Sequence, residues 1–289
     1  MPEMVGMVGL GTMGRPMAQN LSRTFTVLGF DVQESRHAGL AGGAPARSVG
    51  EVGRTCPVIC LSLPSAAIVE EVVLGRGGLV ETVPRGALVI DLSTSLPAVS
   101  RRIAGRLAEK GVEFADAPVS GGEEGARSAS LAIMVGAAPA TFERCRSYLS
   151  AIGKSVVRVG DVGAGGVAKL VNNMIVGSAF AVIAEGFGLA VRCGVDPQSL
   201  YQAMREGWAG SKVLEVSARA IAAREYIPGG TIDMLQKDLA YAKTVATENR
   251  SPVPMTATAH ELFVAGQAAG HGGKSQPALF ELWSRRTGG

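Results

Sequence analysis

The feature that most constrains this chain is a glycine-rich turn close to its start. The segment GLGTMG, residues 9–14, matches the pattern G-x-G-x-x-G and lies between an apolar run, residues 4–10, and a helical pattern over residues 12–22. In dinucleotide-binding folds the first glycine makes the turn, the second lets the backbone approach a pyrophosphate, and the third lets helix and strand pack closely. The N–H groups at the helix start attract phosphates. We therefore predict cofactor contacts from Gly9, Leu10, Gly11, Thr12, Met13 and Gly14.

An acidic residue ends the next predicted strand, residues 25–31. Asp31 stands where a carboxylate can accept hydrogen bonds from both hydroxyls of the adenosine ribose. A 2′-phosphate at this place would bring like charges within a few ångströms of each other, which favours NAD over NADP. Arg36 lies nearby and could pair with a phosphate, so NADP stays the less favoured alternative.

The strand and helix patterns divide the chain into two parts. Up to residue 160, short β-rich runs alternate with helical patterns, which predicts βαβ units and a parallel sheet. From Val167 to Arg192 the pattern is helical, and strand patterns are nearly absent from there on. We therefore predict an α/β fold: a Rossmann domain with a doubly wound parallel sheet over residues 1–162, then an all-α domain for substrate binding and oligomerisation over residues 163–289, opened by the long helix.

The long apolar helix bears on assembly and location. At about 1.5 Å per residue its roughly 26 residues extend about 39 Å, too far to be covered by a domain of about 125 residues, so part of it is expected to pack on another subunit. This predicts a homodimer or homotetramer. Residues 174–191 are apolar enough to suggest a membrane span, but Glu185 and several small residues favour a buried helix. The N-terminus lacks a signal-peptide pattern, so we expect a cytoplasmic protein with no membrane partner.

Charge and cysteine content exclude other classes. The net charge is +3 and the basic residues are scattered, which argues against a nucleic-acid partner. The four cysteines form no CxxC pair and none stands beside a histidine at metal-ligand spacing, so we predict no metal site. Buried, unreactive thiols are the favoured interpretation of Cys56, Cys60, Cys145 and Cys193.

Hydride transfer between a nicotinamide and a carbonyl needs a group that exchanges a proton. None of the three histidines lies in a glycine-rich loop or beside a predicted strand end, so surface or packing roles are favoured for them. Lys169 lies in the first turns of the long helix, and Asn173 follows on the same face. A free lysine has a pKa of about 10.4, but partial burial, the helix N-terminus and a nicotinamide cation are expected to lower it toward about 7–8. Taken without context, a solvated helix lysine is the simpler interpretation.

Five segments of the chain, taken in order, provide a context for Lys169. They are GLGTMGRPMAQNL (9–21), DLSTSLP (91–97), DAPVSGGEEGA (116–126), GAGGVAKLVNN (163–173) and LQKDLAYA (235–242). In these segments the chain resembles the β-hydroxyacid dehydrogenases, the family of 3-hydroxyisobutyrate dehydrogenase and tartronate semialdehyde reductase, with 6-phosphogluconate dehydrogenase as a more distant relative. The resemblance spans nearly the whole chain, and the combination of motifs is highly specific.

The resemblance implies a role for each matched residue. Ser120, Gly121 and Gly122 would hold the substrate carboxylate, and a glycine pair does allow the backbone to approach an anion closely. Lys169 would be the general acid–base, and Asn173 would orient the substrate hydroxyl. The other implied cofactor contacts are Leu63, Pro64, Thr94 and Lys237. For Lys237, an exposed helix lysine is the alternative.

Some positions depart from the family's pattern. Ala129 stands where a glycine is often found before the strand that follows the SGG segment. The family's later G-x-G-x-x-D-x-S pattern appears as GHGGKSQP, residues 270–277. Trp208 could either wall a substrate pocket or pack in the core. These departures leave the particular substrate open.

Three functions are compatible with the predicted fold. The favoured one is reversible oxidation of a short 3-hydroxy acid to its semialdehyde with NAD, so the expected partner is a small hydroxy acid or semialdehyde that carries a carboxylate. Imine reduction and a non-catalytic dinucleotide-binding scaffold are the alternatives. Relatives of both kinds are expected to lack the lysine, whereas Lys169 is present here. Because all three share a fold, the site decides among them.

Overall fold

The computed structural model describes residues 3–37, 40, 43–227 and 229–284. The chain forms two compact units, Met1–Lys169 and Leu170–Gly289. The division falls within one helix, α8 (Ala164–Arg192), whereas the sequence pattern places the domain boundary between residues 162 and 163.

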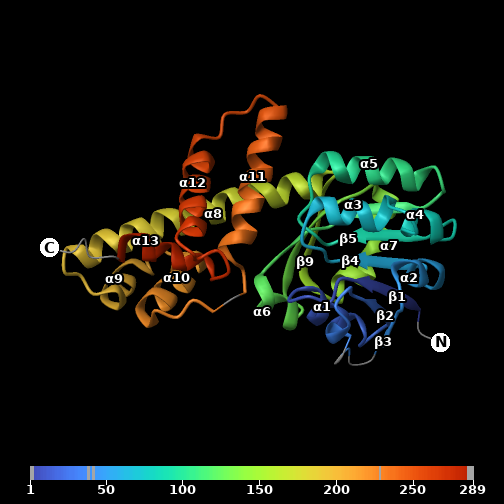
Figure 1. Cartoon of the computed structure of the whole chain (residues 1–289), viewed down its shortest axis with the longest axis horizontal. Coiled ribbons are helices and arrows are strands. Elements are labelled where there is room, and N and C mark those ends of the chain that lie inside the picture. The colour runs from blue at the N-terminus through green and yellow to red at the C-terminus, as the bar shows by residue number, and fades with distance from the viewer. Residues whose placement is uncertain (1–2, 38–39, 41–42, 228, 285–289) are drawn as a thin grey trace. The chain divides into compact units, whose positions relative to one another are not determined.

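The first unit is built on one sheet (Figure 1). Its strands in sheet order are β3 (Gly43–Pro45), β2 (Thr26–Phe30), β1 (Met4–Val8), β4 (Val58–Leu61), β5 (Leu88–Asp91), β6 (Glu113–Asp116), β8 (Leu131–Gly136) and β7 (Val119–Ser120), with β9 (Gly153–Gly160) paired to β8. Pairing is parallel from β3 to β6 and between β8 and β9, but β8 runs antiparallel to β6 and β7. The predicted α/β fold with a Rossmann sheet is therefore confirmed, and its far side is mixed rather than purely parallel.

The register of the parallel strands aligns their carboxyl ends. Val8 pairs with Leu61, Leu61 with Asp91, and Asp91 with Asp116, so these four residues form one row across the sheet. In open parallel sheets, ligands bind beyond this edge. The glycine-rich turn and the segments that contain Pro64 and Thr94 each leave the sheet at this row.

Helices cover both faces of the sheet. They are α1 (Gly14–Leu21), α2 (Val49–Thr55), α3 (Ala66–Leu74), α4 (Leu79–Thr82), α5 (Pro97–Ala108), α6 (Gly122–Arg127) and α7 (Pro139–Ser150), with a 3₁₀ turn, η1, at Glu34–Arg36. On one face Met17 of α1 and Leu149 of α7 share a buried cluster with Met7 and Ile90 of the strands. Gly6 points to the opposite side of β1 and lies against α2. Alternate strand residues therefore supply two cores, as expected of a strand buried on both faces.

The second unit is helical, as predicted. After α8 come α9 (Pro197–Met204), α10 (Lys212–Ala223), α11 (Ile232–Glu248), α12 (Pro254–Ala268), the 3₁₀ segment η2 (Gln276–Phe280) and α13 (Glu281–Ser284). Helices α11 and α12 pack side by side (Figure 1). The core of this unit contains Phe187 of α8, Leu239 of α11, Phe263 of α12 and Phe280 of η2.

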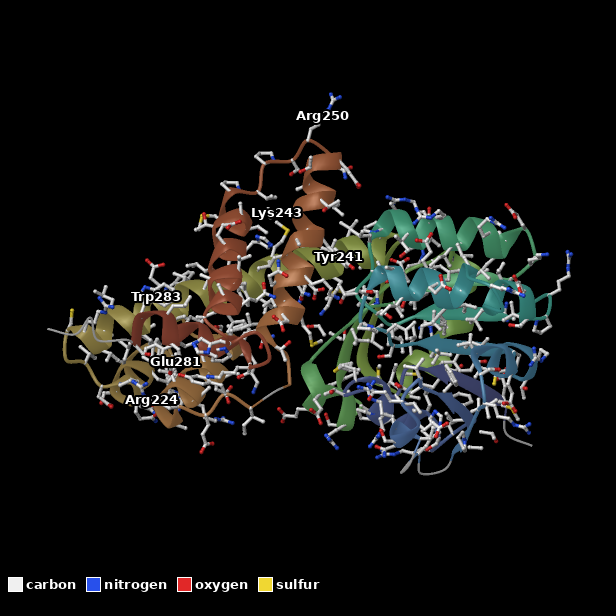
Figure 2. The ribbon with its side chains drawn as sticks, in the orientation of Figure 1. Arg224, Tyr241, Lys243, Arg250, Glu281 and Trp283 are labelled. Atoms are coloured by element: carbon white, nitrogen blue, oxygen red, sulfur yellow. The ribbon has the colours of Figure 1, made fainter. Side chains whose placement is uncertain are left out.

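Polar contacts hold the C-terminal helix within this unit. Glu281 accepts a hydrogen bond from the Tyr226 hydroxyl at 2.6 Å and lies 3.5 Å from the Arg224 guanidinium. Figure 2 shows Arg224, Glu281 and Trp283 in this part of the unit. Burial alone would raise the pKa of Glu281, but the hydroxyls of Ser284 and Tyr226 hold it below its ordinary value. These contacts are structural and fix the end of the described chain.

Helix α8 is less buried than its composition predicts. It is the one helix in the described ranges that is long and apolar enough to span a membrane. Only 33% of its apolar 18-residue stretch is buried, however. Val171, Ile175, Val182 and Leu189 recur at intervals of four or seven residues and are 47–68% exposed. Because such intervals bring residues to one face of a helix, these four form a stripe that the described residues leave exposed. We call them the α8 stripe.

The prediction for the cysteines is right for three of the four. Cys56, Cys60 and Cys145 are buried and free, and burial raises the pKa of each thiol to about 12. Cys193 is exposed, because it follows the last turn of α8 at the surface. Within residues 3–37, 40, 43–227 and 229–284, no cluster of histidine, cysteine or acidic side chains could hold a metal ion.

The sequence departure at Ala129 has a structural consequence that can be tested. Ala129 has φ +54° in the turn after α6, and the Ser130 N–H bonds the Gly125 carbonyl there, the pattern of a helix end that favours glycine. We expect Ala129→Gly to raise the free energy of unfolding by a few tenths to about 1 kcal/mol, since it relieves left-handed strain but adds unfolded-state entropy. Urea unfolding measures this change.

Ala104→Gly in the interior of α5 is the matched control, because the same substitution in an ordinary helical conformation should destabilise by about 1 kcal/mol. If both variants were destabilised equally, the backbone strain assigned to Ala129 would be wrong.

Candidate active site

Two glycines of the glycine-rich turn, Gly9 and Gly14, have no room for a side chain. Gly9 has φ +94°, and a Cβ placed on it would lie 2.1 Å from the Ser62 carbonyl oxygen. A Cβ on Gly14 would lie 1.9 Å from the Gly9 carbonyl oxygen. No side chain caps the start of α1. Within this first turn the Arg15 N–H bonds the Gly11 carbonyl oxygen at 3.1 Å and Pro16 has no N–H. The donors left for an anion, as a pyrophosphate site requires, are therefore the N–H groups of residues 12–14.

Asp31 is held rigidly beside this turn. Its side chain is buried, and it accepts hydrogen bonds from the N–H groups of Leu10 at 2.8 Å and Gln33 at 2.9 Å. The Arg36 guanidinium lies 3.3 Å from the same carboxylate. Burial alone would raise the pKa of Asp31, but the two N–H groups and Arg36 together hold it below its ordinary value. A negative charge is therefore fixed at the end of β2.

A cavity of about 540 Å³ lies along the turn. Gly11 and Thr12 line it from the turn, Arg15 from α1, Arg36 from η1 and Arg127 from α6. Three guanidinium groups and the start of α1 thus surround a space that suits a phosphate-bearing ligand. The complete lining is Leu10, Gly11, Thr12, Arg15, Pro16, Gln19, Arg36, Glu123 and Arg127.

The SGG segment reaches the same region through α6. Ser120 pairs with Ala132 in the sheet, Gly121 has φ +139°, and α6 begins at Gly122. Asn20 of α1 is buried and donates to the Ala126 carbonyl oxygen at 2.7 Å, which fixes α6 against α1. The Asn20 amide therefore holds the two helices together.

The segments after β4 and β5 are bonded to each other. The Ser93 hydroxyl accepts from the Leu63 N–H at 2.9 Å, and Asp91 accepts from the Ser93 N–H at 3.0 Å and the Ser95 hydroxyl at 2.7 Å. Asp91 is fully buried. The network therefore fixes the backbone on both sides of Thr94, which is itself half-buried. Pro64 lies exposed beside this network.

The first turn of α8 is held at the carboxyl edge of the sheet. Asp116, the last residue of β6, accepts hydrogen bonds from the N–H groups of Gly163 and Gly166, both at 2.7 Å. Lys169 lies one turn further along α8 and is half-buried. The turn that precedes Lys169 is therefore bonded directly to the strand that precedes the SGG segment.

In the second unit, Asn173 belongs to a buried polar pair. Its side-chain amide donates to Asp238 of α11 at 2.6 Å, and both side chains are at least 90% buried. Lys237 lies 3.1 Å from the other Asp238 oxygen and 5.3 Å from the centre of the Tyr241 ring, which projects from α11 (Figure 2). Lys237 is therefore not the fully solvated lysine of the alternative interpretation; its side chain is 27% exposed.

Two residues that order candidate site segments, one in each unit, were not predicted from the sequence. Asp238 could have been found from spacing, because it shares the apolar face of α11 with Leu235, Leu239 and Ala242. Asp116 could have been found as a charge that ends a buried strand. Trp208 is fully exposed, which excludes the core-packing alternative, because the short segment between α9 and α10 does not bury it.

Both halves of the chain match models of known families. Residues 4–160 match the NAD-binding domain of 6-phosphogluconate dehydrogenase. Residues 163–283 match a domain described as the NAD-binding region of NADP-dependent 3-hydroxyisobutyrate dehydrogenase. Together the two matches cover nearly all of the chain.

Curated relatives and solved structures agree with these matches. The chain is 38% identical to 2-(hydroxymethyl)glutarate dehydrogenase of Eubacterium barkeri over 98% of this chain and 96% of that protein. It is 36% identical to 2-hydroxy-3-oxopropionate reductase of Escherichia coli over 96% of each. The structure of Mycobacterium tuberculosis 3-hydroxyisobutyrate dehydrogenase with L-serine superimposes with a TM-score of 0.88 at 28% identity, over 99% of this chain and 100% of that one. The chain is thus an oxidoreductase of hydroxy acids and semialdehydes, and it belongs to the 3-hydroxyisobutyrate dehydrogenase family of β-hydroxyacid dehydrogenases.

Proposed function

We propose that this protein oxidises a short 3-hydroxy acid to its semialdehyde with NAD, reversibly, and that Lys169 exchanges the hydroxyl proton. The observation that carries the proposal is the bonding of the first turn of α8 to the end of β6, within the unit that also holds the glycine-rich turn and the SGG segment. The proposed cofactor-binding and substrate-binding segments follow the carboxyl ends of the parallel strands. The first turn of α8 adds Lys169 to the same unit.

Each group has a distinct part in the proposed reaction. The backbone N–H groups of Gly121 and Gly122 and the Ser120 hydroxyl bind the substrate carboxylate. The Lys169 amine takes the hydroxyl proton as the carbon–oxygen double bond forms, and returns it in the reverse direction. Asn173 orients that hydroxyl, and its bond to Asp238 limits the rotation of its amide. Bound NAD supplies the hydride acceptor.

The residues present suit such a cofactor. The crowded glycines, the uncapped start of α1 and the arginines around the 540 Å³ cavity fit a pyrophosphate. The proposed contacts are Gly9, Leu10, Gly11, Thr12, Met13, Gly14, Asp31, Leu63, Pro64, Thr94 and Lys237.

Replacing the proposed acid–base group tests the chemistry. We expect Lys169→Ala to lower kcat by roughly 10²–10⁴-fold, the usual effect of losing a general acid–base, with little change in the KM for NAD. The measurement is absorbance of reduced nicotinamide in steady state. Lys212→Ala is the matched control, because Lys212 is an exposed lysine in the first turn of another helix. Near-normal turnover by a correctly folded Lys169→Ala variant would exclude this role.

Asp31 is the proposed basis of the preference for NAD. The buried charge of Asp31 would lie beside any 2′-phosphate. Arg36 could neutralise such a phosphate, but its guanidinium is already paired with the Asp31 carboxylate. We expect Asp31→Asn to raise the NADP-to-NAD ratio of kcat/KM by roughly tenfold or more, since each tenfold corresponds to about 1.4 kcal/mol. Steady-state kinetics with both cofactors measure this ratio.

Glu34→Gln, an exposed acid in η1, provides the control for a general change in charge. If the ratio is unchanged in Asp31→Asn but changes in Glu34→Gln, cofactor choice does not depend on Asp31.

We also propose that a second copy of the chain covers the α8 stripe, which makes the protein a homodimer or homotetramer. The stripe consists of four aliphatic side chains on one face of a helix, and leaving them in water is unfavourable. If a second copy covers them, no lipid is needed, in agreement with the predicted cytoplasmic location.

Charged substitutions in the stripe test this assembly. Light scattering should give a multiple of the chain mass for the native protein and a smaller particle for the Val182→Glu/Leu189→Glu variant, because buried carboxylates oppose association. Met255→Glu changes an equally exposed residue of α12 and should leave the mass unchanged. A monodisperse native monomer would contradict the proposal.

A further inference from the structure

The carboxylate of Asp116 occupies an unusual position for a helix cap. It is 1% exposed, and its two oxygens accept from two N–H groups of one helix start, Gly163 through Oδ1 and Gly166 through Oδ2. Among the described residues, four other helices begin with a neutral hydroxyl cap, at Ser48, Ser65, Ser211 and Thr231. Helix α9 begins with an aspartate cap, Asp196, but that side chain is exposed. The start of α8 therefore differs from these helices in that its capping carboxylate is buried.

The backbone around this carboxylate is packed without space for side chains. A Cβ on Gly165 would lie 2.4 Å from the Asp116 carbonyl oxygen and 2.5 Å from that of Met134 in β8. A Cβ on Gly136 would lie 2.5 Å from Asp116 Oδ1. The first turn of α8 is thus fixed between the ends of two strands as well as by the two hydrogen bonds.

Holding a charge here has a cost. Burial and, to a smaller extent, the charge of Asp91 on the neighbouring strand β5 raise the pKa of Asp116 to about 7 despite the two N–H groups. A cap that only stabilised the helix would not need to be ionisable, because Ser or Thr can cap a helix without the cost of burying a charge. Two oxygens, however, can fix two donors at once, which a single hydroxyl cannot.

We propose that Asp116 is a positioning residue that sets the place of Lys169 by fixing the first turn of α8 against the end of β6. The proposal deepens the proposed function and depends on the role of Lys169 in it. Gly166 precedes Lys169 by three residues, about 4.5 Å along the helix axis, so a displacement of the capped turn is transmitted directly to Lys169. A misplacement of about 1 Å can cost on the order of 100-fold in rate.

Asp116→Asn tests the proposal because the amide keeps the shape but can accept with only one oxygen. We expect amide hydrogen exchange in residues 161–170 to become faster, because the loss of one hydrogen bond to residue 116 lets the first turn of α8 open more often. We also expect kcat for the best 3-hydroxy acid of the native protein to fall by roughly 10–100-fold, while the KM for NAD stays within about twofold. Mass spectrometry of peptides and steady-state kinetics give the two readouts.

Asp196→Asn is the matched control. Asp196 caps α9 through the Ser199 N–H at 2.8 Å, so it is the same substitution at a helix without Lys169. It should leave kcat and the exchange of residues 161–170 unchanged. If Asp116→Asn does not fold, Gly166→Ala takes its place, because its Cβ would lie 3.2 Å from the Ser95 carbonyl oxygen and move the turn.

The outcomes separate this proposal from the proposed function. Faster exchange with lower kcat and unchanged KM for NAD supports the positioning role. Unchanged exchange, or faster exchange with unchanged kcat, overturns it, and so does an unaffected kcat in Gly166→Ala. Near-normal turnover by Lys169→Ala contradicts the acid–base role and with it this proposal. If the native protein turns over no hydroxy acid, the proposed function fails, and the exchange measurement alone still decides whether Asp116 fixes the turn.

Discussion

The parallel register of the sheet is the constraint on which the rest of the first unit depends. Because Val8, Leu61, Asp91 and Asp116 pair in one row, four segments leave the sheet at the same edge. The two carboxylates of this row then fix segments beyond the sheet edge. Asp91 orders the segment around Thr94, and Asp116 orders the start of α8. A shift of one residue between neighbouring strands would disrupt these contacts together.

Buried polar groups position the candidate site residues in both units. In the first unit, Asp31 holds the glycine-rich turn through the Leu10 N–H, and Asn20 holds α6. In the second, Asp238 holds Asn173. Buried charges and amides destabilise a fold unless they are paired, so their presence on segments with assigned roles points to positioning rather than to stability.

Much of this could be predicted from local patterns. The glycine-rich turn, the strand–helix alternation and the long apolar helix each have a short-range signature, and all three occur where expected. The antiparallel β8 was not predictable, because strand direction depends on pairing between distant segments. The same holds for Asp116, whose partners lie 47 and 50 residues away. The length of α8 did predict that part of it would stay uncovered within one chain, but not which face, since apolar composition does not reveal which face the remaining helices cover.

The central claim is that this site oxidises 3-hydroxy acids with NAD. The most direct measurement is the appearance of reduced nicotinamide when the native protein is given NAD and a panel of short 3-hydroxy acids, with their 2-hydroxy isomers as controls. A parallel assay follows the oxidation of reduced nicotinamide with semialdehydes and with cyclic imines. We expect turnover of at least one 3-hydroxy acid and its semialdehyde, and of none of the imines. Imine reduction, or NAD binding without turnover of any hydroxy acid or semialdehyde, would contradict it.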